Sequence, residues 1–364
     1  MNDSQPTAET EADPAPAAVS ADSPPVPARE KSARVATVAM HTPEADGDSS
    51  AAEEDGEAEA EIEDSEILAD LPDETEDIEL IHSRLSSTSI DKLGLPRFAQ
   101  HLKRLCLRQN FISHLDPDVF GPLTKLEDLD FYDNKIKHTG VALNSLTNLI
   151  TLDLSFNLLR HVPETLGRLT SLRTVYFVQN RISHITGFDA LGATLRSLEL
   201  GGNKIRKLEN LDALVNLEEL WLGKNKITKL ENLSTLKRLK ILSIQSNRIT
   251  KLEGLEQLES LEEFYISHNG VERLEGLEHN LKLRTLDVGN NFISELENVS
   301  HLTTLEELWI NNNNISSLQA LEPQLSISRP WRQFISRGTH FNNWTRRSSS
   351  RYNLRTLYLS SLYL

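Results

Sequence analysis

The feature that most constrains how this chain can fold is a short motif that recurs with almost constant spacing. The motif L-x-x-L-x-L-x-x-N-x-I, with some conservative replacements, occurs ten times in register between residues 102 and 315. Successive motif asparagines are 24 residues apart once, 23 residues apart three times and 22 residues apart five times. They are Asn110, Asn134, Asn157, Asn180, Asn203, Asn225, Asn247, Asn269, Asn291 and Asn313. Spacing this regular predicts a repeat protein in which each copy packs on its neighbours.

Each copy of the motif predicts one short strand with a buried side and an outward side. Alternate side chains of a strand point in opposite directions, so Leu220 and Leu222 should face a common core while Trp221 faces out. The asparagine amide is expected to cap backbone groups that would otherwise be buried without partners. The segments between copies are too short for a full helix, which favours 3₁₀ or short helical turns. We therefore predict an α/β solenoid, a leucine-rich-repeat arc with short parallel strands on its concave face.

Charge and composition divide the chain into regions. Residues 1–77 hold 23 acidic and 3 basic residues and no aromatic residue, so we predict a disordered acidic tail there. Residues 78–322 hold 31 acidic and 28 basic residues and are predicted to form the repeat domain. That domain is expected to open with a degenerate copy, in which Ser83 stands where the asparagine should be.

The repeat pattern fails after the tenth copy. Residues 323–353 predict an irregular basic insert rich in Arg and Ser, and residues 354–364 hold a partial terminal repeat, NLRTLYL. Three interpretations stay open for this end of the chain. It is a basic patch for nucleic acid or membrane, a flexible insert before a terminal half-repeat, or an alternative or mis-spliced terminus in place of the usual cap.

Several classes of function are disfavoured by what the sequence lacks. A single cysteine, Cys106, excludes an intramolecular disulfide and a multi-cysteine zinc site. The first thirty residues do not resemble a secretory signal, and no run of eighteen apolar residues predicts a membrane span. The chain contains no phosphate-binding loop, dinucleotide fingerprint, zinc-protease motif or nucleophile elbow. We therefore expect an intracellular protein that is not an enzyme and has no cofactor or metal.

The outward residue of each predicted strand should form a ladder along the concave face. The ladder runs Cys106, Asp130, Asp153, Tyr176, Glu199, Trp221, Ser243, Tyr265, Asp287 and Trp309. From Tyr176 onward every second rung is aromatic, and Glu263 and Glu307 flank the ladder. Aromatic rings on a rigid surface with acids between them are typical of protein interfaces, so we predict a partner with apolar pockets bordered by Lys or Arg. The alternative is that the rings only stack on neighbouring rungs and shield the sheet.

With the repeats aligned, residues 78–321 resemble the repeat body of the protein phosphatase 1 regulatory subunit 7 family. The segments that carry the resemblance are LCLRQN (105–110), SFNLLR (155–160), LGKNKITKL (222–230), QSNRITKLEGL (245–255), SHNG (267–270) and ENVSHLT (297–303). The resemblance implies a non-enzymatic regulator, nuclear and partly cytoplasmic. It would bind the type 1 protein phosphatase catalytic subunit, alone or with a further phosphatase inhibitor protein. It would also affect the maturation, localisation and mitotic function of that subunit.

The resemblance also implies partner contacts at particular positions. Within the repeats they are Asp153, Tyr176, Glu199, Trp221, Asp287, Glu307 and Trp309, with Tyr176 and Trp221 standing for family phenylalanines. A last contact, a tyrosine of the family's final repeat, falls on Tyr358 if NLRTLYL is the displaced remnant of that repeat. The chain departs from the family pattern by an insertion after Leu325 and by the absence of the family's C-terminal cap.

Two other functions are compatible with a solenoid of this kind. One is the leucine-rich-repeat scaffold of a nuclear ribonucleoprotein particle, and the other is a cytoskeletal or axonemal adaptor. RNA binding would need a basic face, whereas the predicted ladder is acidic and aromatic. An adaptor would recover no phosphatase from a cell extract. We therefore expect neither nucleic acid nor membrane as a partner.

Overall fold

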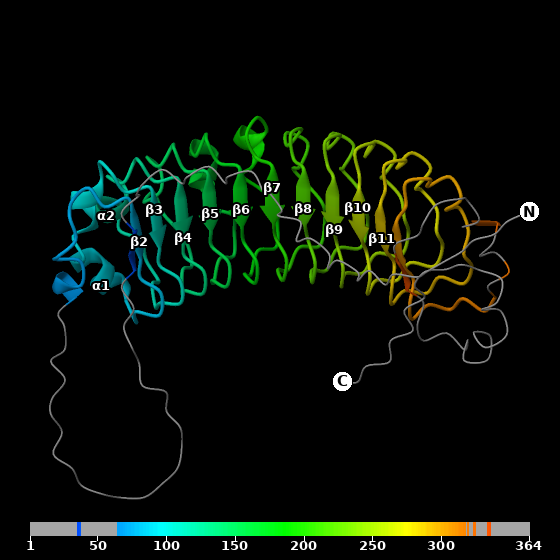
Figure 1. Ribbon diagram of the computed structural model, residues 1–364, viewed down its shortest axis with the longest axis horizontal. Coiled ribbons are helices and arrows are strands. Elements are labelled where there is room, and N and C mark those ends of the chain that lie inside the picture. The colour runs from blue at the N-terminus through cyan, green and yellow to red at the C-terminus, as the bar shows by residue number, and fades with distance from the viewer. Residues whose placement is uncertain (1–34, 38–63, 318, 320–322, 325–332, 336–364) are drawn as a thin grey trace, which may run out of the picture. The chain divides into compact units, whose positions relative to one another are not determined.

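The repeats build one long parallel sheet. The computed structural model describes residues 35–37, 64–317, 319, 323–324 and 333–335. The chain divides into a short unit, Met1–Ser32, and a second unit, Ala33–Leu364, that holds all the described residues. In the second unit, thirteen strands are hydrogen-bonded in chain order (Figure 1). This arrangement confirms the predicted solenoid of short parallel strands.

Every described strand is three residues long, and each pairs in parallel with the next along the chain. Parallel neighbours of this length are possible because each connection returns the chain to the same end of the sheet. The strands are β1 (Val35–Thr37), β2 (Asp77–Glu79), β3 (Arg104–Cys106), β4 (Asp128–Asp130), β5 (Thr151–Asp153), β6 (Thr174–Tyr176), β7 (Ser197–Glu199), β8 (Glu219–Trp221), β9 (Ile241–Ser243), β10 (Glu263–Tyr265), β11 (Thr285–Asp287), β12 (Glu307–Trp309) and β13 (Gln333–Ile335).

Several of the early returning segments contain a short helix, whereas the later ones are turns. The helices are α1 (Ser87–Lys92), α2 (Pro117–Phe120), η1 (Asp64–Glu66), η2 (Leu95–Phe98), η3 (Glu164–Arg168) and η4 (Asp189–Leu191). The hydroxyl of Ser86 accepts a hydrogen bond from the Ser89 backbone N–H and so caps α1. Between residues 192 and 317 the returning segments are turns without helix, because a period of about 22 residues leaves no room for one.

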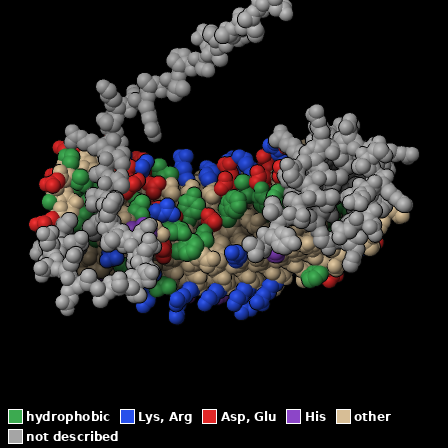
Figure 2. All heavy atoms as spheres, turned by 60° about the horizontal axis from the view of Figure 1, so that its bottom comes forward, with side chains coloured by type: hydrophobic (Ala, Val, Ile, Leu, Met, Phe, Trp, Pro, Cys, Tyr) green, Lys and Arg blue, Asp and Glu red, His purple; other side chains and the backbone are tan. Residues whose placement is uncertain are grey.

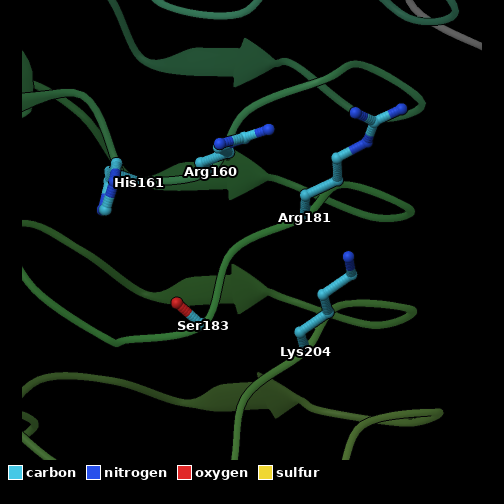
Figure 3. A pocket seen from close by; sticks show the side chains of 5 residues that line it. All are labelled: Arg160, His161, Arg181, Ser183 and Lys204. Carbon is cyan, nitrogen blue, oxygen red and sulfur yellow. The ribbon is translucent and has the colours of Figure 1, made fainter.

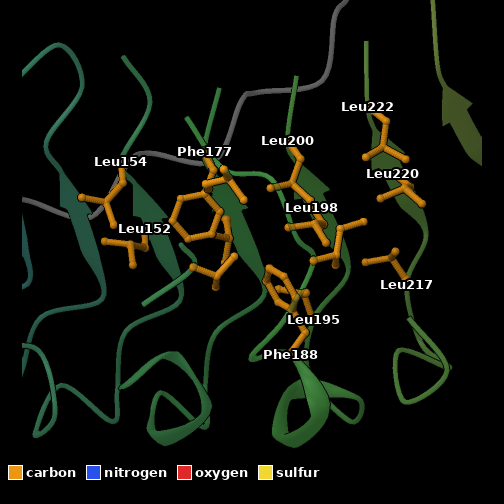
Figure 4. Packing of buried hydrophobic residues seen from close by; sticks show 14 of the residues in the cluster. Leu152, Leu154, Phe177, Phe188, Leu195, Leu198, Leu200, Leu217, Leu220 and Leu222 are labelled. Carbon is orange, nitrogen blue, oxygen red and sulfur yellow. The ribbon is translucent and has the colours of Figure 1, made fainter. Parts of the chain in front are cut away.

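The core is a continuous column of leucine, isoleucine and phenylalanine side chains. In β8, for example, Leu220 and the following Leu222 are both fully buried. Figure 4 shows how the leucines of neighbouring repeats and the ring of Phe177 point into the same interior. Burial of each such side chain stabilises the fold by about 1.5–3 kcal/mol, so stability rises with the number of stacked copies.

The motif asparagines cap buried backbone groups, as predicted, and they also join each repeat to the one before it. The Asn203 Nδ2 donates to the Phe177 carbonyl at 2.8 Å and to the Leu200 carbonyl at 3.0 Å. Its Oδ1 accepts from the Ile182 backbone N–H at 2.9 Å. The same pattern repeats at the other motif asparagines, from Asn110 to Asn313. One side chain therefore satisfies buried backbone groups of two successive copies.

The folded body begins earlier than the sequence predicted. Two parts of the predicted disordered tail are ordered. Val35–Thr37 forms β1 and pairs in parallel with β2. In residues 64–77, Leu68 is buried and the Arg97 guanidinium donates to the Leu71 carbonyl at 2.8 Å. The apolar side chains of this segment cover the first repeat and so keep its core from water. The degenerate copy lies where it was expected, and Ser83 is buried, but its hydroxyl donates to the nearby Ile81 carbonyl and links no second repeat.

The opposite end also differs from expectation within the described residues. Gln333–Ile335 lies in the segment predicted as an irregular insert, yet it forms β13 and pairs in parallel with β12. The remaining predictions for 1–34, 38–63 and 336–364, including the terminal half-repeat and Tyr358, lie outside the described residues.

Candidate protein-binding face

The outward ladder is continuous in space. Strand pairing places each ladder residue beside the next: Asp153 beside Tyr176, Tyr176 beside Glu199, and Glu199 beside Trp221. The same register joins Tyr265, Asp287 and Trp309. We call the surface that bears the ladder the sheet face. Figure 2 shows hydrophobic side chains in its middle and charged side chains along its margins.

The predicted contact residues differ in how far they are exposed. Tyr176, Trp221 and Tyr265 are half-buried, whereas Trp309 is 37% exposed. Asp153, Glu199, Asp287 and Glu307 are half-buried as well. Ser243 is the only buried rung between Cys106 and Trp309, and it separates the group around Trp221 from the group around Tyr265. A partner would therefore meet two clusters of rings and acids on one surface.

Two of the rings are held by a glutamate two residues earlier on the same strand. The Tyr265 hydroxyl donates to the Glu263 Oε2 at 2.7 Å, and the Trp221 Nε1 donates to the Glu219 Oε2 at 3.4 Å. The Ser197 hydroxyl donates to the same Glu219 oxygen at 3.0 Å. Rings fixed in this way lose little further freedom when they bind, which is typical of contact residues. The sequence pattern singled out Glu263 and missed Glu219, although both start the triplet E-[LF]-[WY].

The carboxylates of the ladder are crowded and poorly hydrated. Burial raises the pKa of Asp130 to about 6, against a smaller opposing effect of the hydrogen bond from the Tyr132 backbone. Burial also raises the pKa of Asp153 and of Glu199, and repulsion from Asp153 adds to the effect on Glu199. A cationic side chain of a partner would relieve both the repulsion and the lost hydration.

A hollow of about 430 Å³ lies beside Trp221. It exists because Gly201, Gly202 and Gly223 follow two adjacent strands and carry no side chain to fill the space. Glu199 lies on its wall together with Trp221. The hollow is therefore shaped to receive a protruding side chain next to an aromatic ring and a carboxylate. The signal in the sequence is the glycine two residues after the ladder position, which the motif alone did not reveal.

A second aromatic group at the other end of the sheet face was also missed. The Arg108 guanidinium lies 4.4 Å from the centre of the Tyr132 ring and 3.3 Å from the Asp130 carboxylate. The Tyr132 and Phe156 ring centres are 4.9 Å apart, and Phe156 is 40% exposed. Arg108 and Tyr132 lie two positions after the ladder residue of their repeats and Phe156 lies three positions after it, in two columns that the motif leaves free to vary.

The described part of the chain gives little support for a reactive thiol, a metal site or a membrane span. Burial raises the pKa of the Cys106 thiol to about 11, so this half-buried side chain is a poor nucleophile near neutral pH. Among the described residues no group of three or more His, Cys, Asp or Glu side chains is placed to hold a metal ion. No helix in those same residues is long and apolar enough to cross a membrane.

Comparison with models of protein families supports the assignment of leucine-rich repeats. A model described as "Leucine-rich repeat" matches residues 194–287, and a model of two leucine-rich repeat copies matches residues 281–323. Together the two matches assign leucine-rich repeats to residues 194–323. An internalin of Listeria monocytogenes has the same fold, with a TM-score of 0.57 and 24% identity over 72% of this chain and 80% of the internalin. At that identity the likeness concerns the fold alone.

Two yeast proteins of named function share similar sequence with this chain. The protein phosphatase 1 regulatory subunit SDS22 of Saccharomyces cerevisiae is 51% identical over 76 residues, which is 21% of this chain and 22% of the relative. The subunit of the same name from Schizosaccharomyces pombe is 46% identical over 66 residues, 18% of either chain. The matches thus span about a fifth of each relative. They confirm that the repeats resemble those of the phosphatase 1 regulatory subunits.

Proposed function

We propose that this leucine-rich-repeat protein is a non-catalytic regulatory subunit that binds the catalytic subunit of type 1 protein phosphatase through the sheet face. The observation that carries the proposal is the ladder, in which Tyr176, Trp221, Tyr265 and Trp309 alternate with acidic or small residues in one register. The similarity to the SDS22 subunits supports the choice of partner.

Binding would use the two clusters of the ladder together. A side chain of the partner would enter the hollow beside Trp221, while a flat apolar surface would cover Trp309. Lys or Arg residues of the partner would lie against Asp153, Glu199 and Asp287. Buried aromatic contacts of this kind commonly contribute about 2 kcal/mol or more each, so a few rings dominate the affinity.

By analogy with the phosphatase 1 regulatory subunits, we further propose that binding affects the maturation, localisation and mitotic function of the phosphatase. The site of action would be the nucleus, with some protein in the cytoplasm, and a further phosphatase inhibitor protein could share the complex. The alternatives are a ribonucleoprotein scaffold and a cytoskeletal adaptor. The acidic ladder opposes the first, because a phosphate backbone would be repelled there.

The test is a titration of purified type 1 phosphatase catalytic subunit against the full chain, read by biolayer interferometry. The variant Trp221→Ala, Trp309→Ala should bind at least about tenfold more weakly, because two contact rings are lost. A matched control is Phe111→Ala, Phe292→Ala, since both rings are 56% exposed but lie beyond the strand ends. Thermal unfolding of both variants checks that the fold is kept.

The outcomes separate the candidate functions. Equal affinity for the wild type and the Trp variant would contradict binding through the sheet face. No measurable binding of the phosphatase by the wild type would contradict the proposed partner and favour a scaffold or an adaptor.

A further inference from the structure

Beyond the sheet face, a second surface lies along the edge where the strands end. In each repeat the residues one and three positions after the motif asparagine point outward, because the residue between them is buried. Backbone hydrogen bonds of 2.8 Å, from Lys204 to Ile182 and from Lys226 to Ile205, stack these positions in register. The edge therefore carries two parallel columns of outward side chains.

Both columns are strongly basic in the middle of the chain. From Lys135 to Thr250 they hold twelve positions, of which eight are basic and none is acidic. We call these eight residues the basic row: Lys135, Lys137, Arg160, Arg181, Lys204, Arg206, Lys226 and Arg248. Figure 2 shows a line of Lys and Arg side chains along the middle of the lower margin. The row ends at Glu272, the first acid in either column.

The charges of the basic row are not neutralised within the described residues. None of the eight side chains forms an ion pair there. The edge where the strands begin is different: Lys240 pairs with Glu218 at 2.6 Å, and Arg284 pairs with Glu306 at 3.0 Å. The edge where the strands begin is thus internally paired, whereas the eight side chains of the basic row present their positive charge to the outside.

The row also has a defined recess. Arg160, Arg181 and Lys204 surround a hollow of about 290 Å³, together with His161 and Ser183 (Figure 3). Figure 3 shows that these side chains come from three successive repeats. The guanidinium and ammonium groups and the Ser183 hydroxyl are all hydrogen-bond donors, which suits an anionic ligand.

We propose that the basic row binds a short acidic peptide segment of a partner protein. The row extends over five strand spacings, roughly 24 Å, which matches about seven residues of extended peptide. Carboxylates spaced along such a peptide can each meet one Lys or Arg. This site is separate from the ladder, and it goes beyond the proposed phosphatase contact.

A nucleic acid is less well suited to the same row. The twelve positions include no aromatic side chain on which a base could stack. A duplex is wide enough to reach the sheet face, where the carboxylates of Asp130 and Asp153 lie side by side on adjacent strands and would repel phosphates. A narrow peptide can remain on the basic row alone.

The experiment uses the full chain and a fluorescently labelled octaglutamate peptide, followed by anisotropy at about 50 mM salt, where screening is weak. The variant Arg181→Gln, Lys204→Gln should bind about tenfold more weakly than the wild type. The control Lys229→Gln, Lys251→Gln removes the same charge from bases that pair with Glu253 and Glu275. It should bind within about twofold of the wild type.

Three results would overturn the proposal. They are no binding of octaglutamate by the wild type, equal loss in both variants, and tight binding of a labelled oligothymidylate that octaglutamate does not displace. The Trp221→Ala, Trp309→Ala variant should bind octaglutamate as the wild type does. The basic row and the proposed phosphatase contact can therefore fail independently.

Discussion

The Asn225 side chain joins two repeats: its Oδ1 accepts a hydrogen bond from the Ile205 backbone N–H at 3.0 Å, and its Nδ2 donates to the Leu200 carbonyl at 2.9 Å. Both partners belong to the preceding copy. The same Nδ2 also donates to the Leu222 carbonyl of its own copy at 3.0 Å. The link between copies therefore depends on an amide, which has a donor and an acceptor at once.

We expect Asn225→Ala to lower the free energy of unfolding by about 1–3 kcal/mol, because buried backbone groups lose their partners. The measurement is urea denaturation followed by circular dichroism. Asn314→Ala is the control, since Asn314 is exposed and makes no side-chain hydrogen bond among the described residues. Equal stability of both variants would contradict the bridging role.

The hollow beside Trp221 can be filled without disturbing the backbone. A Cβ at Gly223 would meet only ordinary contacts, the nearest at 3.6 Å from the Gln245 carbonyl oxygen. We expect Gly223→Leu to keep the wild-type melting temperature within a few degrees while it weakens phosphatase binding about tenfold or more. Gly223→Ala should have a smaller effect on binding. If both variants bind as the wild type does, the hollow takes no part in recognition.

Asp130 should make stability depend on pH. Its pKa in the native protein is raised by burial to about 6, from an ordinary value of 3.8. Between these values the native state binds more protons than the unfolded state, so stability falls as pH rises through that window.

Asp130→Asn should therefore flatten the pH dependence between about pH 4 and pH 6 and stabilise the protein near pH 7 by about 1 kcal/mol. This stabilisation is smaller than the whole pKa shift would imply, because the Asp130 carboxylate is partly hydrated and lies near Arg108. The asparagine oxygen can still accept from the Tyr132 backbone. Denaturation midpoints of both proteins, measured over this pH range, test the prediction. If the stability of the variant depends on pH as steeply as that of the wild type, the prediction is wrong.

Cys106 should react slowly in the native protein. A pKa raised from 9.0 to about 11 lowers the thiolate fraction near neutral pH by about a hundredfold. Iodoacetamide should alkylate the native chain about a hundredfold more slowly than the chain in urea, as read by mass spectrometry. The chain has one cysteine, so the signal is unambiguous. Comparable rates would show that the thiol is hydrated in the native protein and would contradict the prediction.

The periodic pattern was sufficient to predict the solenoid and its capping asparagines. Leu220, Leu222 and Asn225 occupy positions set by a local alternation that each strand follows independently of its neighbours. The outward direction of Trp221 follows from the same alternation. The start of the folded body was harder to predict, because Leu68 is one of few apolar residues in an acidic segment and its partners come later in the chain.

What the sequence determined by itself is therefore the repeat, the direction of each side chain and the order of the ladder. The tertiary structure alone decided which outward residues meet: that Glu219 orients Trp221, that three glycines open a hollow beside it, and that the basic row remains unpaired. The physical reason is that lateral neighbours in the solenoid are about 22 residues apart in the chain. Contacts at that separation depend on how neighbouring repeats are aligned and on how far their side chains extend. A motif within one repeat carries no information on either.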